Sequence, residues 1–525
     1  MTGRRRYVLV GVVAVAAHVA ALGGGFVLDD HPAVLDSPAV RGELTLGQLL
    51  GRDFWGQPPG APGGVGTYRP LPVLTFWLDW RVGGGAPWSF HLTNLLLHAF
   101  AAMALTAALS ALESSEERDG RRAPSHAATL AGVIFGALAV NSEAVAGVVG
   151  RADVMAAGLG FVTLGLARLR PGAAAAALLG ALLCKESAVV WLAAVPLCDR
   201  PRRRHVALLA APAAYVALRA ATYGFAAADL VRGRSNNVLI GEPLATRALT
   251  SLGLLALAVR RVLWPGKLSA DYSFAQLLPA RGLDAGVAAG AVALVALVAA
   301  GWLLRRRAPL AARGAVLFLI AWAAVANVFV TLPTIFAERL LYLPAAGAAA
   351  LIAAALVDLA RRARVAALTL TVILVGGNVV RAAARDLDWR DDLALFGSAV
   401  QATPRSARAW ANYGTALTRA GRRPEALTAL EHAIEIAPLW AAPRTLAGVE
   451  LDAEGQPALA EQQLRRAAEL DPDLDEAQFN LARFLARHGR APEAAAVLRA
   501  HVARHPEAAR ARELLRYIEA RLGGR

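Results

Sequence analysis

Repeated apolar runs near 20 residues constrain this chain more than any other feature of its sequence. A helix of about 20 apolar residues crosses the hydrocarbon core of a bilayer, which is about 30 Å thick. The composition agrees, because 56% of the 525 residues are hydrophobic. We therefore predict an all-α polytopic membrane bundle of about eleven spans. The predicted spans are 7–28, 91–112, 127–148, 154–169, 173–184, 187–197, 205–222, 284–304, 314–332, 341–360 and 365–380.

Clusters of arginine predict the orientation of these spans. Such clusters stay on the cytoplasmic side of a membrane, and here they stand at 4–6, 200–204, 305–307 and 361–364. All four share one side if 173–184 and 187–197 form a short hairpin and residues 245–263 lie in the outer interface without crossing. We therefore predict a multi-pass protein of the inner (plasma) membrane, with a cytoplasmic N-terminus and an extracytoplasmic C-terminus. The first span also resembles a signal peptide, but it continues into Asp29, so we predict an uncleaved anchor.

The net charge of +15 would suit a nucleic-acid-binding protein. The arginines are explained by topology instead, so we predict no nucleic-acid partner. The two cysteines, Cys184 and Cys198, lie in one apolar stretch and form neither a disulfide framework nor a metal-ligand spacing. Abundant Ala and a strong preference for Arg over Lys are typical of a bacterium with a GC-rich genome.

A long connection follows the first predicted span. Residues 29–90 are rich in Gly, Pro and Trp, and a connection of this length is expected to be structured. We predict an outer loop with short helices on the membrane surface. We interpret Trp55, Trp77, Trp80 and Trp88 as interfacial anchors rather than as platforms for a sugar.

A 34-residue period begins after the last predicted span. Pro438, Pro472 and Pro506 follow this spacing, and positions occupied by Ala and Leu repeat with it. Proline at the end of each unit and small residues where paired helices cross are typical of tetratricopeptide repeats, which stack into an α-solenoid. The predicted domains are a membrane domain at 1–382, a connecting half repeat at 383–404, three tetratricopeptide repeats at 405–508 and a capping helix at 509–525.

Charged residues stand in four predicted outer connections, at a level where an unpaired charge is costly. Asp29 and Asp30 follow the first span directly. Each charge could belong to a structural ion pair, and the two Asp could simply end a helix in a wet loop. Taken together, acids that accept a proton and cations that neutralise a lipid phosphate favour a catalytic site at one membrane face. The three later connections contribute Glu143, Arg151 and Asp153, then Lys185 and Glu186, and finally Glu338 and Arg339.

These elements, in this order, resemble the transmembrane and tetratricopeptide-repeat-containing O-mannosyltransferases, a family of GT-C glycosyltransferases with bacterial relatives of the same layout. The resemblance spans nearly the whole chain. One departure is Asn141 before Ser142, where the family usually has His. The motifs that carry the resemblance are Asp29-Asp30, YRPL at 68–71, FHLTNLLLH at 90–98, SEAVA at 142–146, GRAD at 150–153, KE at 185–186, ERLLYLP at 338–344 and the terminal repeats.

The resemblance implies transfer of a sugar, expected to be mannose, from a polyprenyl phosphate to Ser or Thr hydroxyls of extracytoplasmic proteins. The attacking hydroxyl needs a base, and the leaving phosphate needs cations. We expect Asp29 or Asp30 to be the base and the other to orient it, in an inverting displacement. By the same resemblance Arg151, Lys185 and Arg339 bind the donor phosphate, while Glu143, Asp153, Glu186, Glu338 and His91 orient these groups or bind the sugar.

The expected partners are the polyprenyl-phosphate donor, an acceptor protein held by the repeats, and membrane lipid. No cofactor is required, and no ligand spacing demands a divalent metal, although one could bind between the carboxylates. Two other interpretations stay open. The membrane part could anchor a scaffold of repeats, or the chain could resemble an O-antigen ligase or polymerase. Such a ligase should carry its long outer loop late among the spans, whereas here the loop follows the first.

Overall fold

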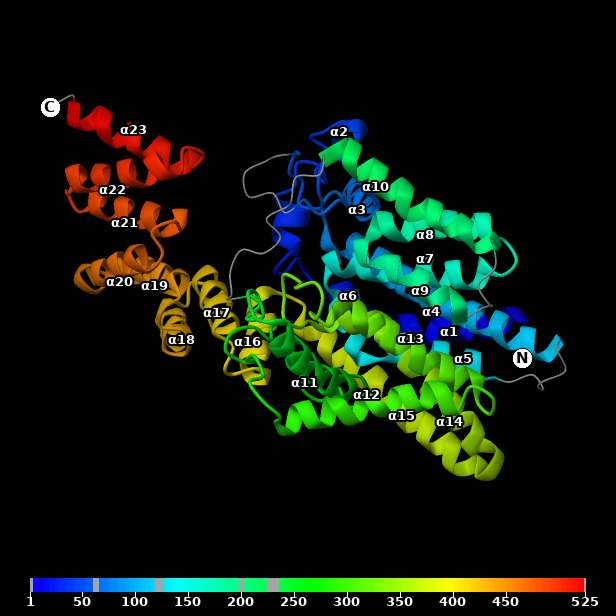
Figure 1. Ribbon diagram of the computed structural model, residues 1–525. Helices are drawn as coiled ribbons and strands as arrows, with labels where there is room; N and C mark the ends of the chain where they lie inside the picture. The colour runs from blue at the N-terminus through cyan, green and yellow to red at the C-terminus, as the bar shows by residue number, and fades with distance from the viewer. Residues whose placement is uncertain (1–2, 60–65, 119–125, 198–202, 224–235, 524–525) are drawn as a thin grey trace. The chain divides into compact units, whose positions relative to one another are not determined.

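The computed structural model describes residues 3–59, 66–118, 126–197, 203–223 and 236–523, and within these ranges it contains helices and loops but no β-strand (Figure 1). The all-α prediction is confirmed. The chain divides into two units, and the division falls between Leu395 and Phe396. The segment Asp271–Leu278 belongs to the second unit although most of its sequence neighbours belong to the first.

In the part of the chain that the structure describes, seven helices are long and apolar enough to cross a membrane. An eighth candidate is a helix pair that bends by 52° between Ala127–Ala137 and Ala139–Ala146. Three shorter apolar helices account for the remaining predicted spans: Pro171–Cys184, Glu186–Leu197 and Pro309–Val325. Each of the eleven predicted segments therefore coincides with or overlaps an apolar helix or the bent pair, and the protein is a multi-pass membrane protein. The seven long helices are Gly3–Gly23, Pro87–Glu113, Val148–Ala167, His205–Thr222, Ala285–Leu303, Glu338–Arg362 and Arg364–Asp388.

The helices of the first unit pack with small residues at their crossings. Gly314 of α13 faces Gly347 of α14, and a Cβ on Gly347 would lie 2.5 Å from the backbone nitrogen of Phe318. Such residues let backbones approach closely inside a membrane. The α-helices are α1 (Gly3–His18), α2 (Leu46–Leu50), α3 (Pro70–Gly83), α4 (Pro87–Arg118), α5 (Ala127–Ala137), α6 (Ser142–Ala146), α7 (Arg151–Ala167), α8 (Pro171–Cys184), α9 (Trp191–Ala194), α10 (Ala210–Tyr223), α11 (Leu244–Leu263), α12 (Ala285–Leu303), α13 (Pro309–Val325), α14 (Tyr342–Arg362) and α15 (Arg364–Asp388).

The connection between α1 and α4 has a hydrophobic core of its own. It contains a π-helix, η2 (His31–Leu35), as well as α2 and α3. Phe54, Phe76 and Phe90 are buried in this core together with Val148 and Ala152, which precede and begin α7. The loop is therefore packed onto the ends of the membrane helices. Trp55, Trp77 and Trp80 lie against the same core, and Trp88 is 49% exposed.

The second unit is a solenoid of paired helices. Gly414 and Gly448, one repeat apart, lie where paired helices cross: a Cβ there would come within 2.8 Å and 2.6 Å of Leu430 and Leu464. Each Leu is buried, as expected from the 34-residue period. The helices are α16 (Asp392–Ala402), which contains the division between the units, α17 (Ala407–Arg419), α18 (Arg423–Ile436), α19 (Ala441–Ala453), α20 (Pro457–Leu470), α21 (Asp475–Arg487), α22 (Ala491–Arg504) and α23 (Ala509–Gly523).

A loop from between α11 and α12 is bonded to the start of this solenoid. The Asp271 carboxylate accepts hydrogen bonds from Ser406 Oγ (2.7 Å) and from Ser273. The backbone nitrogen of Ala407 donates to the Phe274 carbonyl at 2.7 Å. The first repeat is thereby capped by a segment far from it in the sequence.

Candidate functional site

The two adjacent Asp after the first span have different surroundings. Leu28 adopts a positive φ of 52°, which turns the chain sharply just before them. The Asp392 carboxylate holds this turn, because it accepts the Leu28 backbone N–H at 2.9 Å and lies 2.9 Å from His31 Nε2. The turn places Asp29 at the surface of the site and Asp30 in the interior.

Asp30 is completely buried and joins two distant parts of the chain. Its carboxylate accepts hydrogen bonds from the backbone nitrogens of Val27 (3.2 Å), Val148 (3.3 Å) and Val149 (2.9 Å). Burial nevertheless raises the pKa of Asp30 from 3.8 to about 7, since desolvation outweighs these hydrogen bonds. Asp30 thus holds the loop between α1 and α4 onto the connection that precedes α7.

Asp29 is accessible and faces a cation. Its side chain is 31% exposed, and its Oδ2 lies 4.0 Å from Arg339 Nη2. Arg339 is fixed from the other side by Glu143, whose Oε1 lies 2.5 Å from Arg339 Nη1 and whose Oε2 accepts the Arg339 backbone N–H at 3.0 Å. Glu143 is buried, whereas the Arg339 side chain is 26% exposed. One face of the guanidinium is therefore anchored and the other is open toward Asp29.

Two further ion pairs accompany Arg339. Lys185 Nζ lies 2.6 Å from Asp153 Oδ1. Arg69, which directly precedes α3, pairs with Glu186 at 3.0 Å and lies over the Phe54 ring. Lys185 interacts electrostatically with both Arg69 and Arg339, so the three cations share one region. We call Arg69, Lys185 and Arg339 the cation cluster.

Arg69 was not among the predicted site residues. The signal that could have identified it is the YRPL run at 68–71, in which an Arg stands just before a Pro-initiated helix. Its partner Glu186 was predicted, but 117 positions separate the two residues in the sequence. Only the folded loop between α1 and α4 brings them together.

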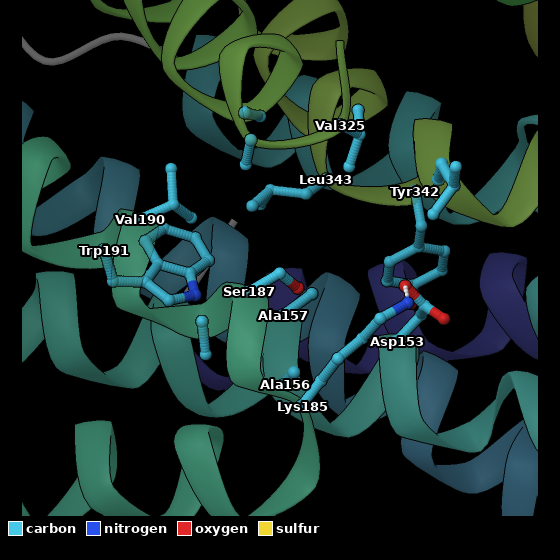
Figure 2. Close-up of a pocket in the computed structure, with 14 residues that line it drawn as sticks. Asp153, Ala156, Ala157, Lys185, Ser187, Val190, Trp191, Val325, Tyr342 and Leu343 are labelled. Carbon is cyan, nitrogen blue, oxygen red and sulfur yellow. Dashed lines mark hydrogen bonds and ion pairs between the residues drawn. The ribbon is translucent and has the colours of Figure 1, made fainter. Parts of the chain in front are cut away.

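A small cavity of about 40 Å³ lies beside the cation cluster (Figure 2). Figure 2 shows the Lys185 side chain reaching Asp153 below the Tyr342 ring, with Val190 and Trp191 at the opposite end of the cavity. Leu343 and Val325 close it from another side. The cavity thus has a charged end and apolar walls from four elements: α7, the Glu186–Leu197 segment, α13 and the start of α14.

Tyr342 is held in this wall by a buried histidine. His98 Nδ1 lies 2.7 Å from the Tyr342 hydroxyl, and His98 Nε2 lies 3.1 Å from the Gly136 carbonyl. A carbonyl oxygen only accepts hydrogen bonds, so a neutral His98 donates a hydrogen bond through Nε2–H and accepts one from the Tyr342 hydroxyl at Nδ1. His98 therefore orients Tyr342.

Arg151, two residues before Asp153 on α7, lies in a buried network of its own. Its guanidinium is 0% exposed and donates to Asn94, Thr75 and the Phe90 carbonyl, at 2.6, 3.0 and 2.9 Å. It also pairs with Asp79 at 2.6 Å. With these donors engaged and no surface open to solvent, Arg151 holds α7 against α3 and α4. The structure does not bring it into contact with the cation cluster in any ion pair or hydrogen bond of the described residues, and its predicted role at the phosphate stays a prediction.

Glu338 and His91 are also buried outside the cation cluster. Glu338 accepts the Ser269 backbone N–H at 2.7 Å and lies 3.9 Å from the buried Arg385. His91 Nε2 lies 3.2 Å from the Gly25 carbonyl, close behind the turn that carries the Asp pair. Both residues support the backbone beside the site.

The arrangement combines one accessible carboxylate with three cations, of which Lys185 lines the end of an apolar cavity. It can accept a proton and hold an anion that carries an apolar group. Among the described residues no group of three or more His, Cys, Asp or Glu side chains is placed to hold a metal ion.

The chain is similar in sequence to a repeat family and to several proteins named O-mannosyl-transferases. A family model for the tetratricopeptide repeat matches residues 453–517. The chain is 34% identical over 284 residues to Protein O-mannosyl-transferase Tmtc2 of Drosophila melanogaster. This alignment covers 48% of this chain and 28% of that protein. It is 24% identical over 449 residues to Protein O-mannosyl-transferase F38B6.6 of Caenorhabditis elegans, in an alignment that covers 83% of this chain and 64% of that protein. It is 26% identical over 481 residues to Protein O-mannosyl-transferase TMTC4 of Homo sapiens, in an alignment that covers 80% of this chain and 64% of that protein. This chain spans less than two thirds of the length of each of these relatives.

A structural role for Arg151 predicts loss of folding when its charge alone is removed. Arg151→Met leaves Asp79 buried without its partner, so we expect a destabilisation of about 3–5 kcal/mol. The double variant Arg151→Met/Asp79→Leu removes both charges and should recover much of that loss. Thermal unfolding of the detergent-solubilised protein measures both. Arg151→Met protein of unchanged stability would contradict this role.

The buried Asp30 predicts a pH-dependent stability. The folded protein binds the Asp30 proton more tightly than the unfolded chain, so this contribution is complete below pH 3.8 and is lost as the pH rises through about 7. We expect the wild type to lose up to about 4 kcal/mol over this interval from Asp30. Asp30→Asn should flatten the curve of stability against pH, whereas Asp36→Asn, at an exposed position of the same loop, should not. Equal slopes for the two variants would exclude Asp30 as the source.

Proposed function

We propose that this chain is an integral membrane glycosyltransferase of the transmembrane and tetratricopeptide-repeat-containing O-mannosyltransferase type, because its motifs resemble that family and its sequence is similar to proteins named O-mannosyl-transferases. The proposed donor is a sugar, expected to be mannose, on a polyprenyl phosphate. The proposed acceptor is a Ser or Thr hydroxyl of an extracytoplasmic protein. The observation that carries the proposal is the accessible Asp29 carboxylate, 4.0 Å from Arg339 within the cation cluster.

In the proposed reaction Asp29 is the general base. It takes the proton of the acceptor hydroxyl while the hydroxyl oxygen attacks the anomeric carbon. The bond between that carbon and the phosphate oxygen breaks, and its electron pair leaves with the polyprenyl phosphate. Attack from the face opposite the leaving group inverts the configuration of the sugar. Asp30 is the worse candidate for the base, because its carboxylate is buried and bonded to three backbone nitrogens.

The cation cluster is the proposed phosphate site. A phosphodiester gains one negative charge when the sugar leaves, and fixed cations stabilise that charge as it develops. Lys185 and Arg339 were expected in this role, and Arg69 joins them. Each is paired with one carboxylate, namely Asp153, Glu143 or Glu186. These three acids orient the cations and keep them from being buried without partners.

The apolar cavity supports a lipid-linked donor over a soluble nucleotide sugar. Its walls of Trp191, Val325 and Leu343 lead away from Lys185. A polyprenyl chain beside these walls would bring its phosphate to the charged end. The cavity itself is smaller than a sugar, so the donor would have to widen it on binding.

The orientation of the chain is part of the proposal. The arginine clusters favour a cytoplasmic N-terminus, which places Asp29, the cation cluster and the repeats on the extracytoplasmic side of the plasma membrane. We propose that the repeats hold the acceptor protein or another partner there. A membrane-anchored scaffold would not need an accessible carboxylate beside three cations.

Substitution of Asp29 tests the function. We expect Asp29→Asn to lower the transfer of labelled mannose from synthetic polyprenyl-phosphate mannose to protein by about 10²–10⁴-fold, because the base is lost while the size of the side chain is kept. The assay compares membranes that hold equal amounts of each variant. Asp36→Asn is the matched control, since Asp36 is exposed on the same loop, and it should keep full activity.

Two outcomes would contradict the assignment. Equal activity of Asp29→Asn and wild type would exclude Asp29 as the base. Transfer from mannose-charged nucleotide in membranes without polyprenyl phosphate, and none from the lipid-linked donor, would exclude the proposed donor.

Reporter fusions test the orientation. Alkaline phosphatase, which is active only outside the cytoplasm, should be active when fused after residue 390 and inactive when fused within residues 305–307. The reverse pattern would place the cation cluster and the repeats in the cytoplasm and would exclude an extracytoplasmic acceptor.

A further inference from the structure

The last two inner helices of the solenoid form a pocket that the proposed chemistry does not use. It is a cavity of about 300 Å³ lined by Phe479 of α21 and by Arg510, Glu513, Leu514 and Tyr517 of α23. Helices α17, α19, α21 and α23 each pack on the next, so the pocket lies on the layer formed by the first helices of successive repeats (Figure 1). This layer lines the extended binding face of a tetratricopeptide solenoid.

The pocket combines aromatic rings with guanidinium groups. The Arg510 guanidinium lies 4.6 Å from the centre of the Phe479 ring, and that of Arg483 lies 5.9 Å from it. Arg521 lies 4.6 Å from the centre of the Tyr517 ring. Tyr517 is 53% exposed. A large aromatic surface therefore faces solvent beneath several cations.

The arginines here differ from most others in the repeats. Arg465, Arg487 and Arg490 each form an ion pair with a carboxylate of a neighbouring helix. Among the ion pairs of the described residues, neither Arg483 nor Arg510 has a carboxylate partner. Their positive charge is available to an anion from outside, and the ring of Phe479 holds them in place by cation–π contact.

We infer that this pocket binds a peptide segment in which a large apolar side chain stands next to a carboxylate. The apolar side chain would occupy the space between Phe479, Leu514 and Tyr517. The volume equals that of about ten water molecules, which suits one large side chain. The carboxylate would accept charge-assisted hydrogen bonds from Arg483 and Arg510.

Glu513 favours this occupant over a nucleic acid. Aromatic rings and arginines also bind single strands, but those sites follow the phosphate backbone with an uninterrupted row of cations. Here Glu513 lines the pocket itself and would repel a series of phosphates. A peptide with one or two carboxylates can place them at the arginines, away from Glu513, and its backbone N–H groups can donate hydrogen bonds to Glu513.

This inference rests on the proposed function only in taking the repeats as the partner-binding surface. It adds the chemistry of the partner, namely an acidic segment with a large apolar residue, to the role of the repeats. Peptide binding does not depend on sugar transfer, so the two can be tested apart.

The experiment measures binding of a fluorescein-labelled peptide to the full chain in lipid nanodiscs by fluorescence anisotropy. The probe carries the sequence Phe-Glu-Glu within a Gly-Ser background. Matched peptides replace both Glu by Gln, or Phe by Ala. We expect each replacement to weaken binding by about tenfold or more, because it removes either the charged or the apolar contact.

Variants of the protein locate the binding site. The double variant Arg483→Gln/Arg510→Gln should weaken binding of the Phe-Glu-Glu peptide by about tenfold or more. The control is Arg512→Gln, which should leave binding unchanged, because Arg512 is exposed on α23 but does not line the pocket. Asp29→Asn, which should lower transfer by about 10²–10⁴-fold, should bind the peptide as wild type does.

Three results would overturn the inference. They are equal binding of the Glu and Gln peptides, equal loss of binding in the Arg512→Gln control, and binding of a labelled single-stranded oligonucleotide that competes with the peptide and depends on Arg510. Peptide binding without any sugar transfer would contradict the proposed function but not this peptide site. Sugar transfer without peptide binding would contradict the peptide site but not the proposed function.

Discussion

The cost of burying charge is the constraint on which the structure of the membrane domain depends. A cation removed from water must have a carboxylate or several acceptors beside it. Arg151 meets this condition with Asp79, Lys185 with Asp153, and Arg339 with Glu143. Each pair joins residues from different elements, so the same contacts that neutralise charge also fix how those elements are placed.

Exposure separates the pairs that hold the fold from those that are open to a substrate. Arg151 is enclosed, and its donors are occupied by protein groups. Lys185 and Arg339 have neighbours of opposite charge but also a surface toward the cavity or solvent. The same distinction divides the Asp pair, because Asp30 bonds backbone nitrogens in the interior while Asp29 faces Arg339. A phosphate could replace or join the carboxylate partners only where the cation is reachable.

The loop between α1 and α4 connects the stability of the domain with its proposed chemistry. Its aromatic core packs on Val148 and Ala152, and Asp30 bonds the connection just before α7. The same loop delivers Arg69 to Glu186. A site built in this way depends on the loop being folded, which explains why the chain has an ordered core in a connection between two membrane helices.

Local patterns of the sequence determined the fold class, the positions of the apolar helices and the tetratricopeptide repeats. Hydropathy over about 20 residues and a 34-residue period depend on neighbours along the chain, so they can be read without knowing the contacts. The resemblance also includes Asp29 and Arg339, which lie 4.0 Å apart in the folded chain. The bounds were less well determined than the positions: the segment predicted at 314–332 is the helix Pro309–Val325, because a peak of hydropathy does not report where a helix begins or ends.

Only the tertiary structure decided which charged residues are accessible. Asp29 and Asp30 are identical and adjacent, yet one φ of 52° at Leu28 and the distant backbone of Val148 and Val149 give them opposite surroundings. Arg69 and Glu186 meet across 117 positions of sequence, and Arg151 is enclosed by Phe76 and Phe90. The physical reason is that burial and ion pairing are properties of segments packed together in space, which residue type and local spacing do not encode.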